Sequence, residues 1–378
     1  MRVLLITAQY PPILGGAELQ AQRLARELDC CGVRVTVLTR PCAGEDLHDR
    51  DGEIRIVRGL SAVPLGPLWG LTYMMNTHRW LRRLASDWDV LHNQHVALHC
   101  WPSVRVARAL GKPCLLRFAC SGPGGDLAVL SGHRFGGRFV DHLRGAERLV
   151  ALTQGGADEI RRYRLPAERI RTIPNGVDLQ RFAVQSWPQL EGSEALRLLF
   201  VGRLNRQKGV DILLSALALV RRPESFRLRV VGIGPERERL RLQAGETGLG
   251  SIVEFCGRQQ DVVTHYAWSE LLVLPSRFEG MPNVVLEAMG CARPVLGTRI
   301  DGTRDLIVER QGGWLVPSDD PVALAQLLEQ VANERGTLRS IGLAGRGIAE
   351  SKYSMARIAS MYLREYEAML AEGTAPST

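Results

Sequence analysis

Two glutamates, Glu279 and Glu287, lie eight residues apart in the segment PSRFEGMPNVVLEAMG and flank a Gly-Met-Pro turn. The segment is otherwise strongly apolar, and its pattern predicts a strand end, a turn and then a helix. An unpaired carboxylate is costly in apolar surroundings, so the pair favours a function over a place on a solvated surface. Carboxylates that face a cleft accept hydrogen bonds from sugar or ribose hydroxyls, which is the chemistry expected here.

A second segment, VGRLNRQKG at residues 201–209, combines glycines with cations between a predicted strand and a predicted helix. Arg203 and Lys208 are placed to converge on a diphosphate, one as a planar fork and the other as a point charge. Lys208 is one of only three lysines among 48 lysines and arginines, which hints that an ammonium group was required there. A solvated cationic loop is the alternative interpretation.

Two glycines, Gly15 and Gly16, open the first predicted helix after a Pro-Pro pair. Backbone N–H groups at such a helix start can approach a phosphate, and the helix dipole favours that charge. A tight turn is the alternative, because glycine also serves any turn that needs unusual dihedral angles. Taken alone, these two glycines say little about function.

These segments must be positioned by strands that alternate with helices, and the pattern occurs twice. Short apolar runs separated by helical patterns predict parallel sheets built from βαβ units, with ligands at the carboxyl ends of the strands. The ten predicted strands cover residues 2–8, 33–38, 89–92, 114–118, 149–152, 196–201, 228–231, 252–255, 271–274 and 294–297. The sequence therefore predicts an α/β protein with two doubly wound, Rossmann-like domains and a cleft between them.

The composition suits two ordinary globular domains. The chain has 378 residues, of which 45% are hydrophobic and 23% are charged, and this excludes a disordered chain. No apolar run approaches the roughly 18 residues that a membrane span needs, and the first apolar stretch is too short for a signal peptide. Eight cysteines without a CxxC pair are typical of reduced thiols. We expect a cytoplasmic protein.

The formal net charge of +8 lies entirely in the N-terminal half, where residues 1–188 hold 25 Lys and Arg against 17 Asp and Glu. Such asymmetry indicates an anionic partner. Nucleic acid is not expected, because the arginines are not interleaved with stacking aromatics and no recognition-helix spacing occurs. Residues 69–84 form an aromatic and basic amphipathic stretch, which is either a helix packed on its own domain or a membrane-surface patch.

Together these segments resemble glycosyltransferase family 4 of the GT-B fold. The resemblance is carried by GGAE near the start, IPNGVD at 173–178, GRLNRQKG, GIGPE at 232–236, the two-glutamate segment and GGWLVP at 312–317. It implies a retaining, metal-independent transferase that moves a sugar from a nucleoside-diphosphate sugar, with UDP or GDP as the nucleotide, to an acceptor hydroxyl. No cofactor is implied beyond this donor substrate.

The resemblance also implies a donor site and its domains. The donor site comprises Gly16, Arg203, Lys208, Arg258, Glu279, Gly280, Met281, Asn283 and Glu287. In it, Arg203, Lys208 and Glu279 take part in catalysis. Arg203 and Lys208 neutralise the diphosphate, Glu279 holds the sugar hydroxyls and Glu287 holds the ribose. The implied domains are an acceptor domain (1–178), a linker (179–196), a nucleotide-sugar domain (197–354) and a helix with a tail that returns to the first domain (355–378).

One departure concerns the acceptor domain. Many family members place a histidine where this chain has Ala119, which is followed by a glycine-rich loop whose only charged residue is Asp126. Asp126 is predicted to contact the donor sugar or the acceptor as a fourth catalytic residue, with a turn or a helix cap as the alternative. His92 and His95 follow a strand and are predicted on the acceptor side. A metal site is not expected, because they have no acidic or cysteine partner at matching spacing.

The resulting expectation is a transferase of cell-envelope polysaccharide, lipopolysaccharide or glycolipid biosynthesis. It would act on a lipid-linked or saccharide acceptor, with a peripheral contact at the inner face of the membrane. A nucleotide-sugar-binding protein without transfer activity is an alternative, motivated by Ala119. A GT-B epimerase or phosphorylase is a further alternative, disfavoured because the family pattern covers the phosphate and glutamate segments together.

Overall fold

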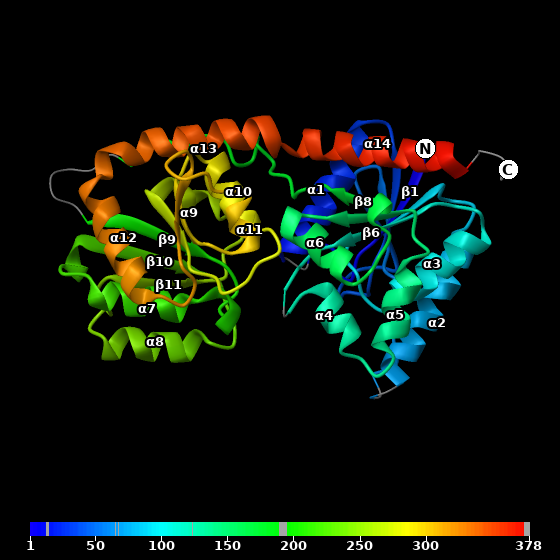
Figure 1. The fold of residues 1–378 in the computed structure, drawn as a ribbon, viewed down its shortest axis with the longest axis horizontal. Coiled ribbons are helices and arrows are strands. Elements are labelled where there is room, and N and C mark those ends of the chain that lie inside the picture. Colours follow the sequence, from blue (N-terminus) through cyan, green and yellow to red (C-terminus); the bar gives the residue numbers. More distant parts are fainter. Residues whose placement is uncertain (13–14, 65, 67, 123, 189–194, 374–378) are drawn as a thin grey trace. The chain divides into compact units, whose positions relative to one another are not determined.

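The computed structural model describes residues 1–12, 15–64, 66, 68–122, 124–188 and 195–373, and the chain divides into two compact units (Figure 1). Unit 1 comprises Met1–Gly176 together with the segment from Met355 onward, and unit 2 comprises Val177–Ser354. Each unit is built on one sheet with helices packed against it. The predicted α/β class with two parallel-sheet domains is confirmed.

Unit 1 contains an eight-stranded sheet in the order β3-β4-β2-β1-β5-β6-β7-β8. Every neighbouring pair is parallel except β3 and β4, which are antiparallel. The strands are β1 (Arg2–Ile6), β2 (Arg34–Leu38), β3 (His48–Asp51), β4 (Ile54–Val57), β5 (Val90–Asn93), β6 (Cys114–Phe118), β7 (Arg148–Ala151) and β8 (Ile170–Thr172).

The helices of unit 1 cover both faces of this sheet. They are α1 (Gly16–Cys30), α2 (Leu68–Arg83), α3 (Cys100–Ala109), α4 (Asp126–Ser131), α5 (Gly136–Leu143), α6 (Gln154–Arg162), the short 3-10 helix η1 (Ala167–Arg169) and α14 (Met355–Gly373). Successive residues of a strand point to opposite faces, so β1 supplies Leu4 to one core and Val3 to the other. The first core lies under α2, α3 and α5, and the second lies under α1 and α14.

Helix α14 completes the second core of unit 1, although it is the last helix of the chain. It packs against α1, and Tyr362 and Tyr366 are buried beneath it. Arg148 on β7 is almost fully buried and donates to Glu365 at 2.7 Å and to Glu372 at 2.5 Å. These charge-assisted bonds fix the position of α14 along the sheet.

Unit 2 contains a six-stranded, fully parallel sheet in the order β11-β10-β9-β12-β13-β14. The strands are β9 (Leu196–Val201), β10 (Phe226–Val231), β11 (Val253–Gly257), β12 (Leu271–Leu274), β13 (Val295–Thr298) and β14 (Gly313–Val316). The helices are η2 (Arg206–Lys208), α7 (Val210–Leu219), η3 (Pro223–Ser225), α8 (Arg237–Glu246), α9 (Val263–Trp268), α10 (Asn283–Gly290), α11 (Asp301–Arg304), α12 (Pro321–Asn333), η4 (Arg335–Thr337) and α13 (Leu338–Lys352).

All ten predicted strands are present, whereas β3, β4, β8 and β14 were not predicted. Strand β3 has the sequence HDRD, which lacks any apolar residue, and β8 has only three residues. The segment expected as a linker, 179–196, also differs: its described first part belongs to unit 2, where Phe182 is buried against Tyr266. Among the described helices, none is long and apolar enough to cross a bilayer.

Candidate functional site

In unit 2, the loop that follows β9 lies against the loop that follows β10. A Cβ atom at Gly232, which has φ of 144°, would lie 1.8 Å from the carbonyl oxygen of Gly202. A Cβ atom at Gly234 would lie 2.2 Å from the carbonyl oxygen of Leu204. Only glycine permits such a close approach of two backbones. The contact fixes the conformation of the segment that carries Arg203.

The next part of the same loop positions Lys208. The side chain of Asn205 accepts a hydrogen bond from the Lys208 backbone N–H at 3.3 Å and caps η2. Gly209 follows with φ of 67°, and a Cβ atom there would lie 2.0 Å from the carbonyl oxygen of Pro275. This second close approach brings the β9 loop against the end of β12, so that Lys208 faces the segment containing Glu279.

Lys208 and Glu279 form an ion pair at the carboxyl ends of these strands. The Nζ atom of Lys208 donates to Oε1 of Glu279 at 2.5 Å, and the hydroxyl of Ser276 donates to the same oxygen at 2.7 Å. Glu279 is only 7% exposed. Among the described residues, no hydrogen-bond donor reaches its other oxygen, Oε2. The carboxylate is therefore held rigidly, with one oxygen directed to accept from an incoming hydroxyl.

The turn after Glu279 leads directly into α10, whose N-cap is Pro282. The positive end of the helix dipole thus lies next to the ion pair, where it favours an anion. A Cβ atom at Gly302 would lie 2.5 Å from the carbonyl oxygen of Gly280, so α11 packs closely on this turn. Gly280, Met281 and Asn283 accordingly lie in one tightly packed segment, with the helix beginning at Asn283.

Glu287 lies on α10, one turn beyond Asn283 and therefore on the same face of the helix. It is 6% exposed, and one of its oxygens accepts from the hydroxyl of Tyr266 at 3.3 Å. That hydroxyl also donates to the carbonyl oxygen of Val284, at 3.2 Å. The tyrosine therefore braces the carboxylate against its own helix.

Two arginines of the predicted donor site have no partner among the described residues. Arg203 and Arg258 are exposed, and neither side chain forms a hydrogen bond or an ion pair within the described part of the chain. Arg258 directly follows β11, so it lies at the carboxyl ends of the strands, as do the loops after β9, β10 and β12. These guanidinium groups add uncompensated positive charge to this edge.

Gly16 is the one predicted donor residue that belongs to unit 1. It begins α1 behind Gly15, the N-cap, and a Cβ atom at Gly15 would lie 2.3 Å from the carboxylate of Glu18. Burial raises the pKa of this glutamate. In unit 1, as in unit 2, a glycine turn and the start of a helix therefore follow a strand of the parallel sheet.

Unit 1 has a cavity of about 550 Å³ at the carboxyl ends of β1, β2 and β5. Its walls are largely apolar, and polar groups occur at a few points. The lining includes Ala8, Arg40, Trp69, Tyr73, His95, Val96, Leu98, Asp126, Val129, Leu130 and His133. Apolar walls with a few polar groups are typical of small-molecule sites.

Asp126 joins two walls of this cavity. Its Oδ2 atom accepts from the backbone N–H of Ala119 at 2.7 Å and from that of Val96 at 3.5 Å, which links the β6 loop to the β5 loop. It does not cap α4, since the N-cap is Gly125 without a side-chain bond. Burial raises the pKa of Asp126 to about 6, although the backbone donors oppose this shift.

The histidines separate into a core residue and a cavity residue. His92 is fully buried between Tyr362 and Tyr366, and its Nδ1 atom lies 2.6 Å from the Tyr366 hydroxyl. Its predicted place on the acceptor side is therefore wrong, because α14 covers it. His95 lines the cavity, and burial lowers its pKa to about 4. The imidazole of His95 is accordingly neutral at pH 7.

Asp87 and Asp89, which lie on either side of Trp88, both form ion pairs with arginines of unit 1. Asp87 bonds Arg55 at 2.8 Å and Asp89 bonds Arg2 at 2.5 Å, so this pair serves as structural charge. Among the residues that the structure describes, no group of three or more His, Cys, Asp or Glu side chains could hold a metal ion.

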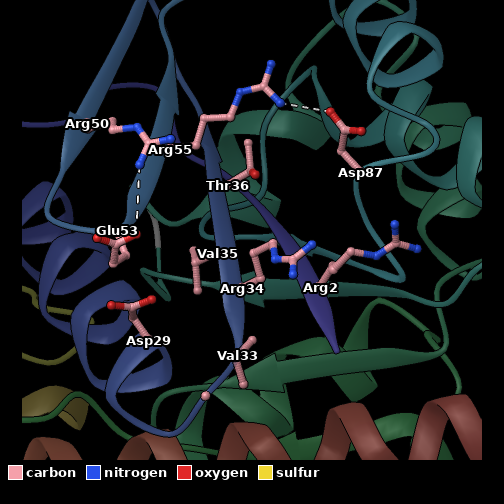
Figure 2. Close-up of a pocket in the computed structure, with 11 residues that line it drawn as sticks. Arg2, Asp29, Val33, Arg34, Val35, Thr36, Arg50, Glu53, Arg55 and Asp87 are labelled. Atoms are coloured by element: carbon pink, nitrogen blue, oxygen red, sulfur yellow. Dashed lines mark hydrogen bonds and ion pairs between the residues drawn. The ribbon is translucent and has the colours of Figure 1, made fainter.

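A second cavity of unit 1, of about 510 Å³, lies at the opposite end of the sheet, where β1 and β2 begin (Figure 2). Figure 2 shows two ion pairs among its lining residues, Arg55 with Asp87 and Arg50 with Glu53, and Arg2 pairs with Asp89 outside the lining. Most of its arginines are thus compensated. It shares no residue with the cavity at the carboxyl ends.

Several residues of both sites escaped the sequence analysis. Ser276, which shares the Oε1 atom of Glu279 with Lys208, and Tyr266, which braces Glu287, were not predicted. Arg40 was also missed, although it follows β2 closely and the strand-end rule applied to the other residues would have found it. Ser276 and Tyr266 carry no comparable signal, because their partners lie elsewhere in the sequence.

Comparison with known proteins agrees with this geometry. A model of Glycosyltransferase Family 4 matches residues 14–181, and a model of Glycosyl transferases group 1 matches residues 195–334, so that together they span more than half of the chain. A D-inositol 3-phosphate glycosyltransferase of Saccharomonospora viridis is 34% identical over 250 residues, which are 61% of this chain and 58% of that protein. An uncharacterized glycosyltransferase of Methanocaldococcus jannaschii is 23% identical, with 97% of this chain and 98% of that protein covered.

Solved structures share the fold. Sucrose-phosphate synthase of Thermosynechococcus elongatus aligns with a TM-score of 0.82 at 21% identity, over 98% of this chain and 99% of that one. The HepE protein of Anabaena, crystallised with UDP-glucose, aligns with a TM-score of 0.77 at 18% identity, over 97% and 100% of the two chains. With two parallel-sheet α/β units of the GT-B type, the chain belongs to glycosyltransferase family 4 and the group 1 glycosyltransferases.

Proposed function

We propose that this glycosyltransferase is a retaining enzyme that uses a nucleoside-diphosphate sugar, with UDP as the first candidate nucleotide. Unit 2 binds the donor and unit 1 binds the acceptor. The observation that carries the proposal is the buried ion pair of Lys208 with Glu279, at the carboxyl ends of β9 and β12 and next to the start of α10. UDP is favoured over GDP because similar folds were crystallised with UDP or UDP-glucose.

The charges of unit 2 suit the departure of a diphosphate. As the bond to the sugar breaks, negative charge grows on the leaving phosphate oxygens. The ammonium of Lys208, the guanidinium of Arg203 and the dipole of α10 stabilise that charge from fixed positions, so little reorganisation is needed. In this proposal these cations replace a metal ion.

The carboxylates orient the rest of the donor. Glu279 accepts hydrogen bonds from hydroxyls of the transferred sugar through Oε2, because Lys208 and Ser276 already donate to Oε1. Glu287 accepts from the ribose hydroxyls, with Tyr266 holding its carboxylate in place. Arg258 borders the base. Such positioning converts binding energy into the correct alignment of the sugar.

Asp126 acts on the acceptor side, where the family histidine is replaced by Ala119. Its carboxyl group lines the unit 1 cavity and is fixed by two backbone donors. His95, which is neutral, lines the same cavity and can accept or donate a hydrogen bond to an acceptor hydroxyl. We assign both residues to acceptor positioning, with Asp126 next to the reacting groups.

The acceptor is proposed to be a saccharide or lipid-linked glycan of envelope polysaccharide or lipopolysaccharide assembly, met at the inner face of the membrane. Unit 1 holds 26 Lys and Arg against 19 Asp and Glu, whereas unit 2 holds 22 against 21, so the positive charge resides with the acceptor domain. Two structures with this fold are described as lipopolysaccharide glycosyltransferases, which supports the same class of acceptor.

The first experiment is a thermal-shift screen of the purified chain against UDP-, GDP-, ADP- and dTDP-sugars, without added metal. A ligand that binds only the folded state must raise its stability. We expect a shift with one donor class in the wild type and a lost shift in Lys208→Ala, whereas Glu254→Gln, an exposed glutamate of β11, behaves as the wild type.

Donor turnover then separates the alternatives. Slow hydrolysis of the donor in the absence of an acceptor is expected of a transferase. A thermal shift without any turnover indicates a nucleotide-sugar-binding protein, and release of sugar that depends on phosphate indicates a phosphorylase. No shift with any of the four donors would contradict the donor site assigned to unit 2.

A further inference from the structure

Arg277 lies on the loop after β12, next to Ser276 and two residues before Glu279, and its side chain is only 17% exposed. Its Nη1 and Nη2 atoms donate to the two carboxylate oxygens of Asp211 at 3.0 and 2.9 Å. Its Nε atom donates to a carboxylate oxygen of Asp319 at 2.7 Å. Two parallel bonds to one carboxylate and a third bond to another require the planar fork of an arginine. This contact is therefore geometrically specific, unlike that of a solvated surface charge.

These two carboxylates belong to different loops of unit 2. Asp211 lies in the first turn of α7, directly after the β9 loop, and Asp319 lies between β14 and α12. Strands β9 and β12 are neighbours in the sheet, whereas β13 separates β12 from β14. One arginine side chain thus joins three loops at the carboxyl ends of the strands, where the predicted donor site lies.

The same arginine also binds the backbone that leads to Lys208. Its Nη1 atom donates to the carbonyl oxygen of Arg206 at 2.5 Å, and its backbone N–H donates to the carbonyl oxygen of Gln207 at 2.8 Å. The Gln207 side chain in turn donates to the carbonyl oxygen of Phe278 at 2.9 Å. These bonds end directly before Lys208 on one loop and directly before Glu279 on the other. They therefore fix the two loops against each other at the ion pair.

We propose that Arg277 is a positioning residue, which sets the distance and direction of the Lys208 ammonium relative to the Glu279 carboxylate. Two carboxylates compensate the charge of Arg277, so it adds no free cation for a diphosphate and differs in role from Arg203. Its effect on the ion pair is a property of unit 2 alone, whereas its effect on the reaction rests on the proposed function. A small displacement of either charge would spoil the alignment with the leaving phosphate and the sugar.

A first experiment measures the ion pair without any donor. The coupling free energy between Lys208 and Glu279 follows from urea titrations of the full chain and of K208A, E279A and K208A/E279A. The same cycle is repeated in the R277Q background and in the D319N background. Asparagine tolerates the φ of 57° at Asp319 as aspartate does, so D319N removes the charge and leaves the backbone unchanged. The coupling should fall by about half or more in R277Q and by less in D319N.

A second experiment measures the rate of donor hydrolysis in a single turnover and, separately, the affinity for UDP, at a temperature where all variants are folded. In R277Q the rate should fall by about tenfold or more while the affinity weakens by less than about threefold, because alignment matters most in the transition state. R277K should recover only part of the rate, since an ammonium group lacks the planar fork. A rate that falls more than the affinity identifies positioning, which a general loss of stability would not produce.

The matched control is R335Q. Arg335 donates to both carboxylate oxygens of Glu270 at 2.8 and 2.6 Å, directly before β12, so this pair lies at the opposite end of the strand that precedes Arg277. The side chain of Glu270 is only 1% exposed, so R335Q should lose at least as much stability as R277Q. It should nevertheless hydrolyse the donor at the wild-type rate, because it lies away from the ion pair.

Three results would overturn the inference: a wild-type rate in R277Q, equal slowing by R335Q and R277Q, or an unchanged coupling in the R277Q background. If R277Q does not fold, D319N decides by the same criteria. Absence of donor hydrolysis in the wild type would contradict the proposed function instead. The coupling cycle would then still decide the role of Arg277, because it needs no donor.

Discussion

The donor region of unit 2 and the cavity of unit 1 occupy the same place in their sheets, the carboxyl ends of parallel strands, yet they are built in opposite ways. In unit 2, Lys208 and Ser276 both donate to one carboxylate oxygen of Glu279, and glycines allow one backbone to pack directly against another. In unit 1, apolar walls enclose the space, and Asp126 is bound to the backbone of its own loops.

The difference shows how one sheet architecture can serve two kinds of ligand. A diphosphate has the same charges in every nucleotide sugar, so fixed cations and close backbone contacts suit it. An acceptor with an apolar part is bound by shape, and polar groups at a few points then set its orientation. The following variants test whether the two regions act as independently as this comparison implies.

The largest effect should come from the ion pair. Lys208→Ala leaves Glu279 buried without its counter-charge and removes a cation from the leaving group, so donor hydrolysis and transfer should both fall by about 100-fold or more. In Glu279→Ala, the rates of donor hydrolysis and transfer should fall by a similar factor. Single-turnover rates with a labelled donor measure both.

A double-mutant cycle sharpens this prediction. Because Lys208 and Glu279 are each other's ion-pair partners, the loss in the double variant should be far smaller than the product of the two single losses. If the rate loss of the double variant equals the product of the two single losses, Lys208 and Glu279 do not act as a unit.

Gly232→Ala should follow in size, because a Cβ atom there would meet the carbonyl oxygen of Gly202 at a φ that favours glycine. We expect a loss of about 2 kcal/mol in the free energy of unfolding, together with weaker donor binding. Gly245→Ala is the control. It lies in α8 with no atom within 4 Å of its added Cβ, so it should stabilise by about 0.5–1 kcal/mol. Urea titrations compare the two.

Asp126→Asn should lower transfer by about tenfold and leave donor affinity and donor hydrolysis intact, since the residue lies in unit 1. Loss of nucleotide affinity would contradict the separation of the two regions. The pH profile of transfer should also lose the inflection near pH 6 that ionisation of Asp126 gives to the wild type.

The same variant tests the pKa through stability. The folded-state pKa of Asp126 is raised from 3.8 to about 6. Its favourable contribution to the free energy of unfolding is therefore complete below pH 3.8 and is lost as the pH rises through 6. The wild type should therefore lose stability relative to Asp126→Asn over this window. Denaturant titrations at several pH values between 4 and 7 measure the difference. If the stabilities of the two proteins change with pH in the same way, the pKa of Asp126 lies outside this range.

The smallest effect is expected at Glu287. Glu287→Gln retains an acceptor and the contact with Tyr266, so nucleotide affinity should weaken only by about threefold to tenfold. The preference for UDP over 2′-deoxy-UDP should shrink in this variant, because the carboxylate is assigned to the ribose hydroxyls. Calorimetric titration with both nucleotides gives the two affinities.

The structure brings together more of the residues predicted for the donor site than of those predicted for the acceptor side, for a physical reason. Glu279 stood out because a carboxylate in an apolar segment needs a partner, and Lys208 because lysine is rare in this chain. Each follows a strand whose carboxyl end fixes its place. The sharing of one oxygen with Ser276 depends on side-chain geometry, which no spacing encodes. His92 lies near the end of β5, but helix α14 covers it, and its contact with Tyr366 spans 274 residues of sequence. Pairings over such a distance leave no local pattern.

Helix α14 also determines the order in which the two units can mature. Residues 355–373 complete the core beside Val3 and Leu5, so the sheet face that α1 covers in part is fully covered only after α14 has been synthesised. Unit 2, which is continuous in sequence, is fully synthesised earlier. During synthesis unit 1 must therefore keep an apolar sheet face exposed while unit 2 can already be folded, which makes the N-terminal half the part of the nascent chain that most needs a chaperone.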